Sequence, residues 1–221
     1  MKKIIMPLLI GAAILVAGPA AVASEMDGVA VELKAGTLGT GLEVNYAINS
    51  KFTVGLGLNK FSRSTSDSAD NIDYDVDLDL QTFALLGSYH PFAGTFRLTG
   101  GIMNNGNELK MKAKPTGTYD IGGATYTAAQ VGSLAATVDF NTLVPYLGLG
   151  WGKSATSGFG ATFDIGVLFQ GSPNVSFTAN GTLASDPTFQ ANLKQEEANA
   201  EDDIKGFTMY PVISLGLNYR F

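Results

Sequence analysis

The sequence predicts an all-β protein: an eight-stranded antiparallel transmembrane β-barrel, closed, with a lumen filled by side chains. Three observations predict this class. The chain starts with an export signal, its later segments alternate apolar with small or polar residues, and the connections between those segments alternate between short and long. Hydrophobic residues make up 45% of the 221 residues and charged residues 15%. The chain is therefore too apolar for a disordered protein.

The first segment has the pattern of a signal peptide. Lys2 and Lys3 precede a short apolar run, and Ala21–Ala23 has the small-x-small pattern of a cleavage site. An anchoring helix is the alternative, but the apolar run is shorter than the about 20 residues that a membrane helix needs. We expect residues 1–23 to be removed and residues 24–221 to form one barrel domain. The mature chain then has 12 basic and 20 acidic residues, a net charge of −8.

Alternation is clearest at the end of the chain. Every second residue, which would lie on one face of a strand, is apolar: Phe207, Met209, Pro211, Ile213, Leu215, Leu217, Tyr219 and Phe221. An average strand has about 5–6 residues, whereas a strand that crosses a membrane needs about 9–11. The length of this run favours a barrel in lipid, with glycines inside that leave room for larger side chains.

Eight strands are expected, in chain order, near residues 29–37, 40–48, 52–62, 73–90, 95–114, 138–153, 159–178 and 205–221. The first two are separated by a turn between Gly36 and Gly41. Besides the last strand, five of the eight are supported by an apolar parity at Leu42, Val44, Tyr46 and Ile48; Phe52, Val54, Leu56 and Leu58; Phe83, Leu85 and Tyr89; Pro145, Leu147, Leu149 and Trp151; and Phe159, Ala161, Phe163, Ile165, Val167 and Phe169.

The connections differ in length in a regular way. Those at 49–51, 91–94 and 154–158 are short, and those at 63–72, 115–137 and 179–204 are long. An even strand number places both termini and the short turns in the periplasm of a bacterial outer membrane. A soluble ligand barrel is the alternative, but it would put the bulky parity inside and the glycines outside.

Aromatic residues mark the ends of the strands at the short turns: Tyr89, Phe92, Phe96, Trp151, Phe159, Tyr219 and Phe221. Such rings prefer the membrane–water interface. Leu217, Tyr219 and Phe221 also resemble the C-terminal signal that the barrel-assembly machinery of the outer membrane recognises. The expected partners are that machinery, outer-membrane lipid and lipopolysaccharide.

Charged residues gather in three places. Glu32, Lys34, Glu43, Arg97, Asp164 and Arg220 have the inward parity. Charges in a narrow lumen must be paired or hydrated, so these six form either a structural ion-pair plug or a polar path that reorganises. Asp73, Asp75, Asp77 and Asp79 share one face of the fourth strand, and Lys110, Lys112 and Lys114 share one face of the fifth.

These two charged rows leave several interpretations open. The aspartates form a solvated strand extension or a weak divalent-cation site. The lysines neutralise them or contact lipopolysaccharide phosphate. The apolar parity changes along the fourth strand, which predicts a bulge near residues 80–82. A hairpin is expected at 119–127, and Asp186-Pro187 predicts the start of a helix over 187–203.

The sequence contains no cysteine and one histidine. Disulfides, thiolate metal sites and schemes that need two histidines are therefore excluded. No catalytic set, cofactor site or metal-ligand set is apparent, so an enzyme is not expected. The acidic balance lacks the basic footprint of nucleic-acid binding.

Several stretches carry a family resemblance: Tyr74–Asp79, Val144–Gly150, Gly171–Val175, Glu196–Asn199 and Tyr210–Val212. Together they resemble the CarO family, the carbapenem-associated outer-membrane proteins also called ornithine-uptake porins. The resemblance implies an eight-stranded closed barrel that passes small amino acids. The function then expected is a narrow selective channel for small polar solutes such as amino acids. A structural or surface-interaction barrel without transport is the alternative.

Overall fold

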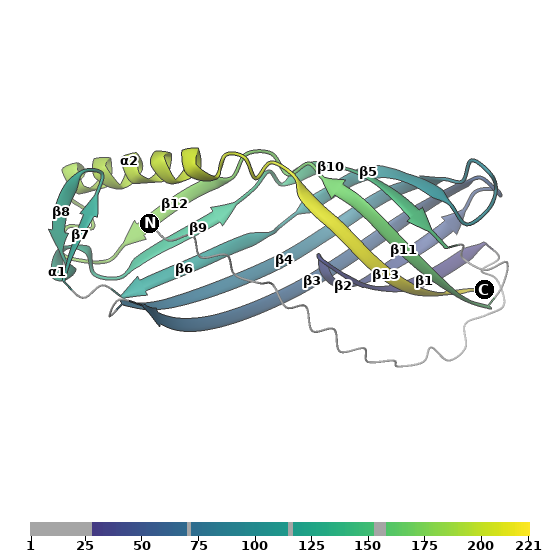
Figure 1. Cartoon of the computed structure of the whole chain (residues 1–221), viewed down its shortest axis with the longest axis horizontal. Helices are drawn as coiled ribbons and strands as arrows, with labels where there is room; N and C mark the ends of the chain where they lie inside the picture. Colours follow the sequence, from purple (N-terminus) through teal and green to yellow (C-terminus); the bar gives the residue numbers. More distant parts are fainter. Residues whose placement is uncertain (1–27, 70–71, 115–116, 153–157) are drawn as a thin grey trace.

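The chain is all-β, with two helices. The computed structural model describes residues 28–69, 72–114, 117–152 and 158–221; the predicted signal peptide lies outside them. Eight of the thirteen strands in this part of the chain form a ring (Figure 1): β1 (Val29–Gly36), β2 (Gly39–Ala47), β3 (Phe52–Ala69), β4 (Ile72–Tyr89), β5 (Arg97–Asn105), β10 (Leu143–Trp151), β11 (Gly158–Leu168) and β13 (Tyr210–Arg220).

Every neighbouring pair in the ring is antiparallel. The order runs β1, β2, β3, β4, β5, β10, β11, β13 and returns to β1. The last strand lies between β11 and the first strand, with Leu217 opposite both Leu33 and Ala161. The predicted eight antiparallel strands are thus present as a ring.

A second, open sheet continues beyond the ring, and we call it the distal sheet. It consists of β4 from Ile72 to Leu80, the paired part of β3, and three further strands: β6 (Glu108–Lys114), β9 (Leu134–Asp139) and β12 (Asn174–Ala179). The 18-residue β4 belongs to both sheets, because its first half pairs with β6 and its second half with β5. The molecule is therefore elongated, with the ring at one end and the distal sheet at the other (Figure 1).

The predicted extents of several strands are wrong. The strand predicted at 52–62 continues to Ala69, so most of the connection predicted at 63–72 is strand. The strand predicted at 205–221 begins at Tyr210. The segments 95–114, 138–153 and 159–178 are each broken, at 106–107, 140–142 and 169–173. At the first break, the side-chain Oδ1 of Asn107 accepts from Gln81 N at 3.1 Å, in place of a backbone carbonyl. At the third, Gly171 has a φ of 76° and Pro173 has no N–H to donate. On one side of each break the segment is a ring strand, and on the other side it is a strand of the distal sheet.

The predicted bulge in β4 is also wrong. The register with β3 is continuous from Phe52 opposite Tyr89 to Ala69 opposite Ile72. The parity of β4 is constant, and only the surroundings of its faces change. The face that is apolar outside the ring at Phe83 carries aspartates along the distal sheet, while the opposite face continues from the ring interior.

A small second core lies at the distal end. The hairpin of β7 (Thr118–Ile121) and β8 (Ala124–Thr127) is followed by α1 (Ala128–Val131), and α2 (Pro187–Ile204) runs beside β12 (Figure 1). The predicted hairpin and the predicted helix are confirmed. The Asp186 side chain caps α2 by accepting from two backbone N–H groups of the first turn at 2.9 Å each.

The second core is apolar and joins these elements. Its buried residues are Ile121, Tyr126, Val131, Phe189 and Leu193. Neither helix in the described residues is long and apolar enough to cross a membrane.

Candidate functional site

The outer surface of the ring is apolar and exposed. Leu215 is 64% exposed, Leu147 60% and Leu56 50%, and each belongs to the predicted outward parity. Exposed leucines, isoleucines, valines and phenylalanines occur on all eight ring strands. Soluble monomers rarely expose a continuous apolar patch above a few hundred Å².

Aromatic side chains cluster at the short-turn end of this surface. Trp151 packs against Phe96 and Phe163, with ring centroids 5.6 and 6.0 Å away. Tyr219 lies between Phe159 and Phe221, at 5.0 and 5.1 Å. The predicted assembly-signal residues Leu217, Tyr219 and Phe221 lie along this end of β13 and just beyond it.

A chain of ion pairs crosses the interior of the ring. Lys34 Nζ of β1 is 3.1 Å from Glu43 Oε2 of β2 and 3.1 Å from Asp164 Oδ2 of β11. The other oxygen of Asp164 is 2.6 Å from Arg97 Nη2 of β5. Arg97 also donates to the backbone carbonyl of Gly152 at 2.9 Å. Four side chains from four strands thus form one connected network, which we call the ionic layer.

The other two predicted inward charges lie beside the ionic layer. Glu32 is 2% exposed and accepts a hydrogen bond from the Thr162 hydroxyl. Arg220 lines the cavity described below. Sequence reasoning missed Asn45, whose amide donates to Glu43 at 2.9 Å. Its inward parity, two residues after Glu43, is the signal that could have found it.

Glycines make room for the ionic layer. A Cβ at Gly150 would collide with the Asp164 carboxylate and the Arg97 guanidinium, and a Cβ at Gly216 would collide with Glu32. The glycine parity of the strands therefore has a packing cause. It leaves the volume that the charged side chains from opposite walls occupy.

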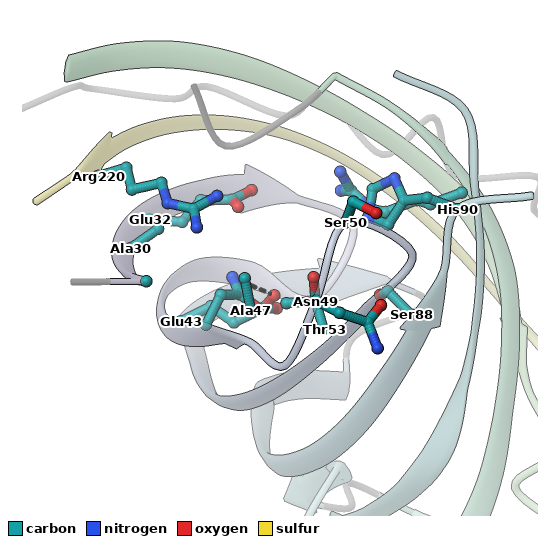
Figure 2. A pocket seen from close by; sticks show the side chains of 13 residues that line it. Ala30, Glu32, Glu43, Ala47, Asn49, Ser50, Thr53, Ser88, His90 and Arg220 are labelled. Carbon is teal, nitrogen blue, oxygen red and sulfur yellow. Dashed lines mark hydrogen bonds between the residues drawn. The ribbon is translucent and has the colours of Figure 1, made fainter. Parts of the chain in front are cut away.

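A cavity of about 350 Å³ opens beside the ionic layer at the short-turn end (Figure 2). Its polar lining carries both signs of charge: Glu32, Glu43, Asn45, Asn49, Ser50, Thr53, Ser88, His90, Arg97 and Arg220. The His90 ring nitrogen Nδ1 is 3.1 Å from the Gly94 carbonyl in the adjacent turn.

An apolar layer fills the interior on the distal side of the ionic layer. Its buried members are Leu38, Ala84, Leu86, Met103, Val144, Tyr146, Leu168 and Val212. A cavity of about 30 Å³ lies between the two layers. Lys34 and Glu43 border it together with Leu86 and Met103. The interior of the ring thus contains two successive layers, one of charged and one of apolar side chains.

Sequence reasoning missed the apolar layer. Leu168 and Val212 belong to the parity that otherwise carries glycine and polar residues, so the alternation hid them. The available signal is positional: Val144, Leu168 and Val212 are inward and apolar near the distal ends of β10, β11 and β13.

The two charged rows lie on one face of the distal sheet. Asp75 is opposite Lys112 and Asp77 is opposite Lys110, so the rows have the same height. The nearest ion partner of Lys110 is Glu108 at 2.5 Å. Their hydrogen bond and the charge of Glu108 raise the pKa of the Lys110 ammonium. The side chains of Asp73 and Lys114 lie outside the described residues. Among the described residues no group of three or more histidine or carboxylate side chains is placed to hold a metal ion.

Comparison with known proteins identifies the fold. No family model matches the chain, and no curated protein matches it. Solved structures match, among them two from Acinetobacter baumannii. CarO2 aligns with 22% identity and a TM-score of 0.58, over 90% of this chain and 100% of that chain. CarO aligns with 18% identity and a TM-score of 0.54, over 89% of this chain and 98% of that one. The resemblance inferred from the sequence is confirmed for the fold.

Proposed function

We propose that this protein is an outer-membrane β-barrel of Gram-negative bacteria. The observation that carries the proposal is the inversion of the ring: leucines are exposed outside, and an ion-pair network is buried inside. Exposing this apolar outer surface to water costs free energy, whereas contact with lipid tails does not. The fold shared with the CarO structures supports the same reading. No catalysis is part of the proposal.

The dimensions of the ring support this placement. β13 has 11 residues, which at about 3.3 Å per residue and a tilt of about 40° rise roughly 28 Å. The apolar band of such barrels is about 25 Å tall. The Trp151 and Tyr219 clusters then lie at one interface, as amphipathic rings prefer.

The membrane placement has a direct test. Unboiled and boiled samples of the refolded protein should migrate differently in detergent gels, and circular dichroism should show sheet. A mainly helical spectrum in detergent would contradict the barrel.

The short turns face the periplasm in this proposal, and the distal sheet stands on the cell surface. A cysteine at Asp75 should then react with a membrane-impermeant label on intact cells. A cysteine at Lys51, in a short turn, should react only after the outer membrane is opened. The reverse pattern would invert the topology.

The finer function that we propose is slow, selective passage of small polar solutes such as amino acids. The cavity of about 350 Å³ supports it, because it is lined by both signs of charge and is large enough for such a solute. The alternative is a structural or surface-interaction barrel without transport, and the apolar layer favours it. Passage requires that layer to move.

Solute flux into liposomes distinguishes the two. Leu86→Ala with Met103→Ala removes volume beside the 30 Å³ cavity and should raise flux above that of the wild type. Leu85→Ala with Ile102→Ala is the matched control, because these side chains are 44% and 47% exposed on the outer surface. If the wild type and the Leu86/Met103 variant both match empty vesicles, the structural function replaces transport.

Proposed partners follow from the same placement. The outer apolar surface contacts outer-membrane lipid, and Lys110 and Lys112 lie where lipopolysaccharide phosphate would meet the distal sheet. Phe221, with Tyr219 and Leu217, is the proposed contact for the barrel-assembly machinery.

A further inference from the structure

The helix α2 covers the free edge of the distal sheet. Within the described chain, β12 pairs with β9 along one edge, and α2 lies along the other (Figure 1). The backbone N–H groups of Val175 and Phe177 point to that second edge. They donate to side-chain carboxylates of α2, to Glu201 at 3.0 Å and to Glu197 at 2.7 Å. Side chains of a helix thus occupy the positions that a neighbouring strand would take.

The spacing of these groups makes the match possible. Residues four apart in a helix are about 6 Å apart along its axis. Alternate residues of a strand are about 6.6 Å apart. Glu197 and Glu201 therefore present two acceptors at nearly the repeat of the outward N–H groups of β12.

The two halves of α2 are attached differently. The N-terminal half contributes both buried residues of the helix, Phe189 and Leu193, to the second core. Asn192 also donates to the Tyr126 hydroxyl at 2.5 Å, and Glu196 accepts from Gly122 N at 3.3 Å. The half from residue 197 onward has no buried residue, and its hydrogen bonds to β12 are those of the two carboxylates.

The covered edge lacks the usual protection against pairing. Residues 172–180 contain no charged side chain, and the strand itself contains no proline. Natural proteins protect exposed edges with lysine, proline or a covering element. Here the covering element is α2, and a strand of this composition pairs readily once it is exposed.

We propose that the C-terminal half of α2 is a removable cover, and that the uncovered edge of β12 pairs with β12 of a second copy of this chain. Antiparallel self-pairing satisfies the two-fold symmetry of a dimer. Val175 of one copy then bonds Phe177 of the other, and the two Ser176 residues face each other on the axis. The inference concerns only the distal sheet and does not depend on transport.

Three variants of the full chain, refolded in detergent, test the cover. Glu197→Ala with Glu201→Ala removes both acceptors. Asp202→Ala with Asp203→Ala removes the same charge from exposed positions of the same helix. Glu197→Gln with Glu201→Gln removes the charge but keeps an acceptor oxygen at each position.

The alanine pair at 197 and 201 should increase amide exchange at Val175 and Phe177 by roughly tenfold or more. It should also give a concentration-dependent dimer in sedimentation. The other two variants should stay monomeric, with exchange near that of the wild type.

A cysteine at Ser176 reports the geometry. Directly opposed residues at a non-hydrogen-bonded position have Cα atoms about 4.5 Å apart, within reach of a disulfide. Ser176→Cys should therefore cross-link in the Glu197/Glu201 alanine background and remain reduced in the control background.

Two results would overturn the proposal. Unchanged exchange at Val175 and Phe177 in the alanine pair would show that the carboxylates do not hold the cover. Fast exchange with a monomer at every concentration, and no disulfide between two copies of the Ser176→Cys variant, would show that the bare edge does not pair with itself.

Discussion

Replacing Arg97 with alanine should destabilise the ring and leave it closed. The substitution removes the 2.6 Å ion pair with Asp164 and the 2.9 Å hydrogen bond to the Gly152 carbonyl. The two paired side chains are 11% and 6% exposed. Breaking such a buried pair costs about 3–5 kcal/mol.

Two features reduce this cost. Asp164 keeps Lys34 at 3.1 Å, and the cavity of about 350 Å³ beside Arg97 gives water access to the remaining charge. We therefore expect Arg97→Ala to lower the free energy of unfolding by about 2–3 kcal/mol. Asp164→Ala should cost about 3–4 kcal/mol, because it leaves two cations without their shared carboxylate.

A double-mutant cycle isolates the pair. The coupling energy between Arg97 and Asp164 should be about 2 kcal/mol, since residues in one ion-pair network couple by about 0.5–3 kcal/mol. Urea unfolding in detergent can be followed by the fluorescence of Trp151, the one tryptophan of the chain. Lys205→Ala is the control, because its ion pair with Asp202 is exposed, and it should cause no measurable loss.

The outcome that refutes this reasoning is specific. If Arg97→Ala and Asp164→Ala each cost less than about 0.5 kcal/mol, or if their effects add without coupling, the ionic layer does not stabilise the ring. Solute flux in Arg97→Ala should equal that of the wild type, because the apolar layer remains in place. A large increase in flux would show instead that the charges alone close the interior.

Three further predictions concern other parts of the chain. Gly216→Ala should destabilise the ring, because the new Cβ collides with Glu32, whereas Gly206→Ala, with nothing within 4 Å of the new Cβ, should not; urea titration compares them. Deleting Phe221 should leave refolding in vitro nearly intact but lower the outer-membrane level in cells at native expression, measured by membrane fractionation; an unchanged level would contradict the assembly signal. Asp186→Ala should cost about 0.5–2 kcal/mol of local stability, seen as faster amide exchange in the first turn of α2 and not in β13.

The ring was predictable because its two environments impose a period of two on the sequence. The outward positions of the ring strands, such as Leu215 in β13, are mostly apolar. The outward face and the number of strands can therefore be predicted from the alternation in the sequence. The helix was predictable for a local reason: Asp186 caps and Pro187 starts it. Such signals require no knowledge of distant contacts.

The rest depends on contacts between distant segments. At the break near Asn107, the side chain of Asn107 accepts the hydrogen bond of Gln81 N in place of a backbone carbonyl. Nothing in the local sequence predicts this hydrogen bond. Leu168 is inward and apolar only because other apolar side chains of the ring meet it at that height. The bonds from Glu197 and Glu201 to β12 exist because a helix and a strand, with partners 20 and 26 residues apart in the chain, lie side by side.

The position of β13 has a consequence for synthesis. The final strand completes the ring by pairing with β11 and with β1, which lies near the opposite end of the chain. Until β13 has been synthesised, both β1 and β11 therefore carry an open edge. Long-range pairing of this kind is slow, and exposed edges invite association with other chains. A chain that lacks this eleven-residue strand cannot complete the ring, and it exposes two strand edges to pairing with other chains.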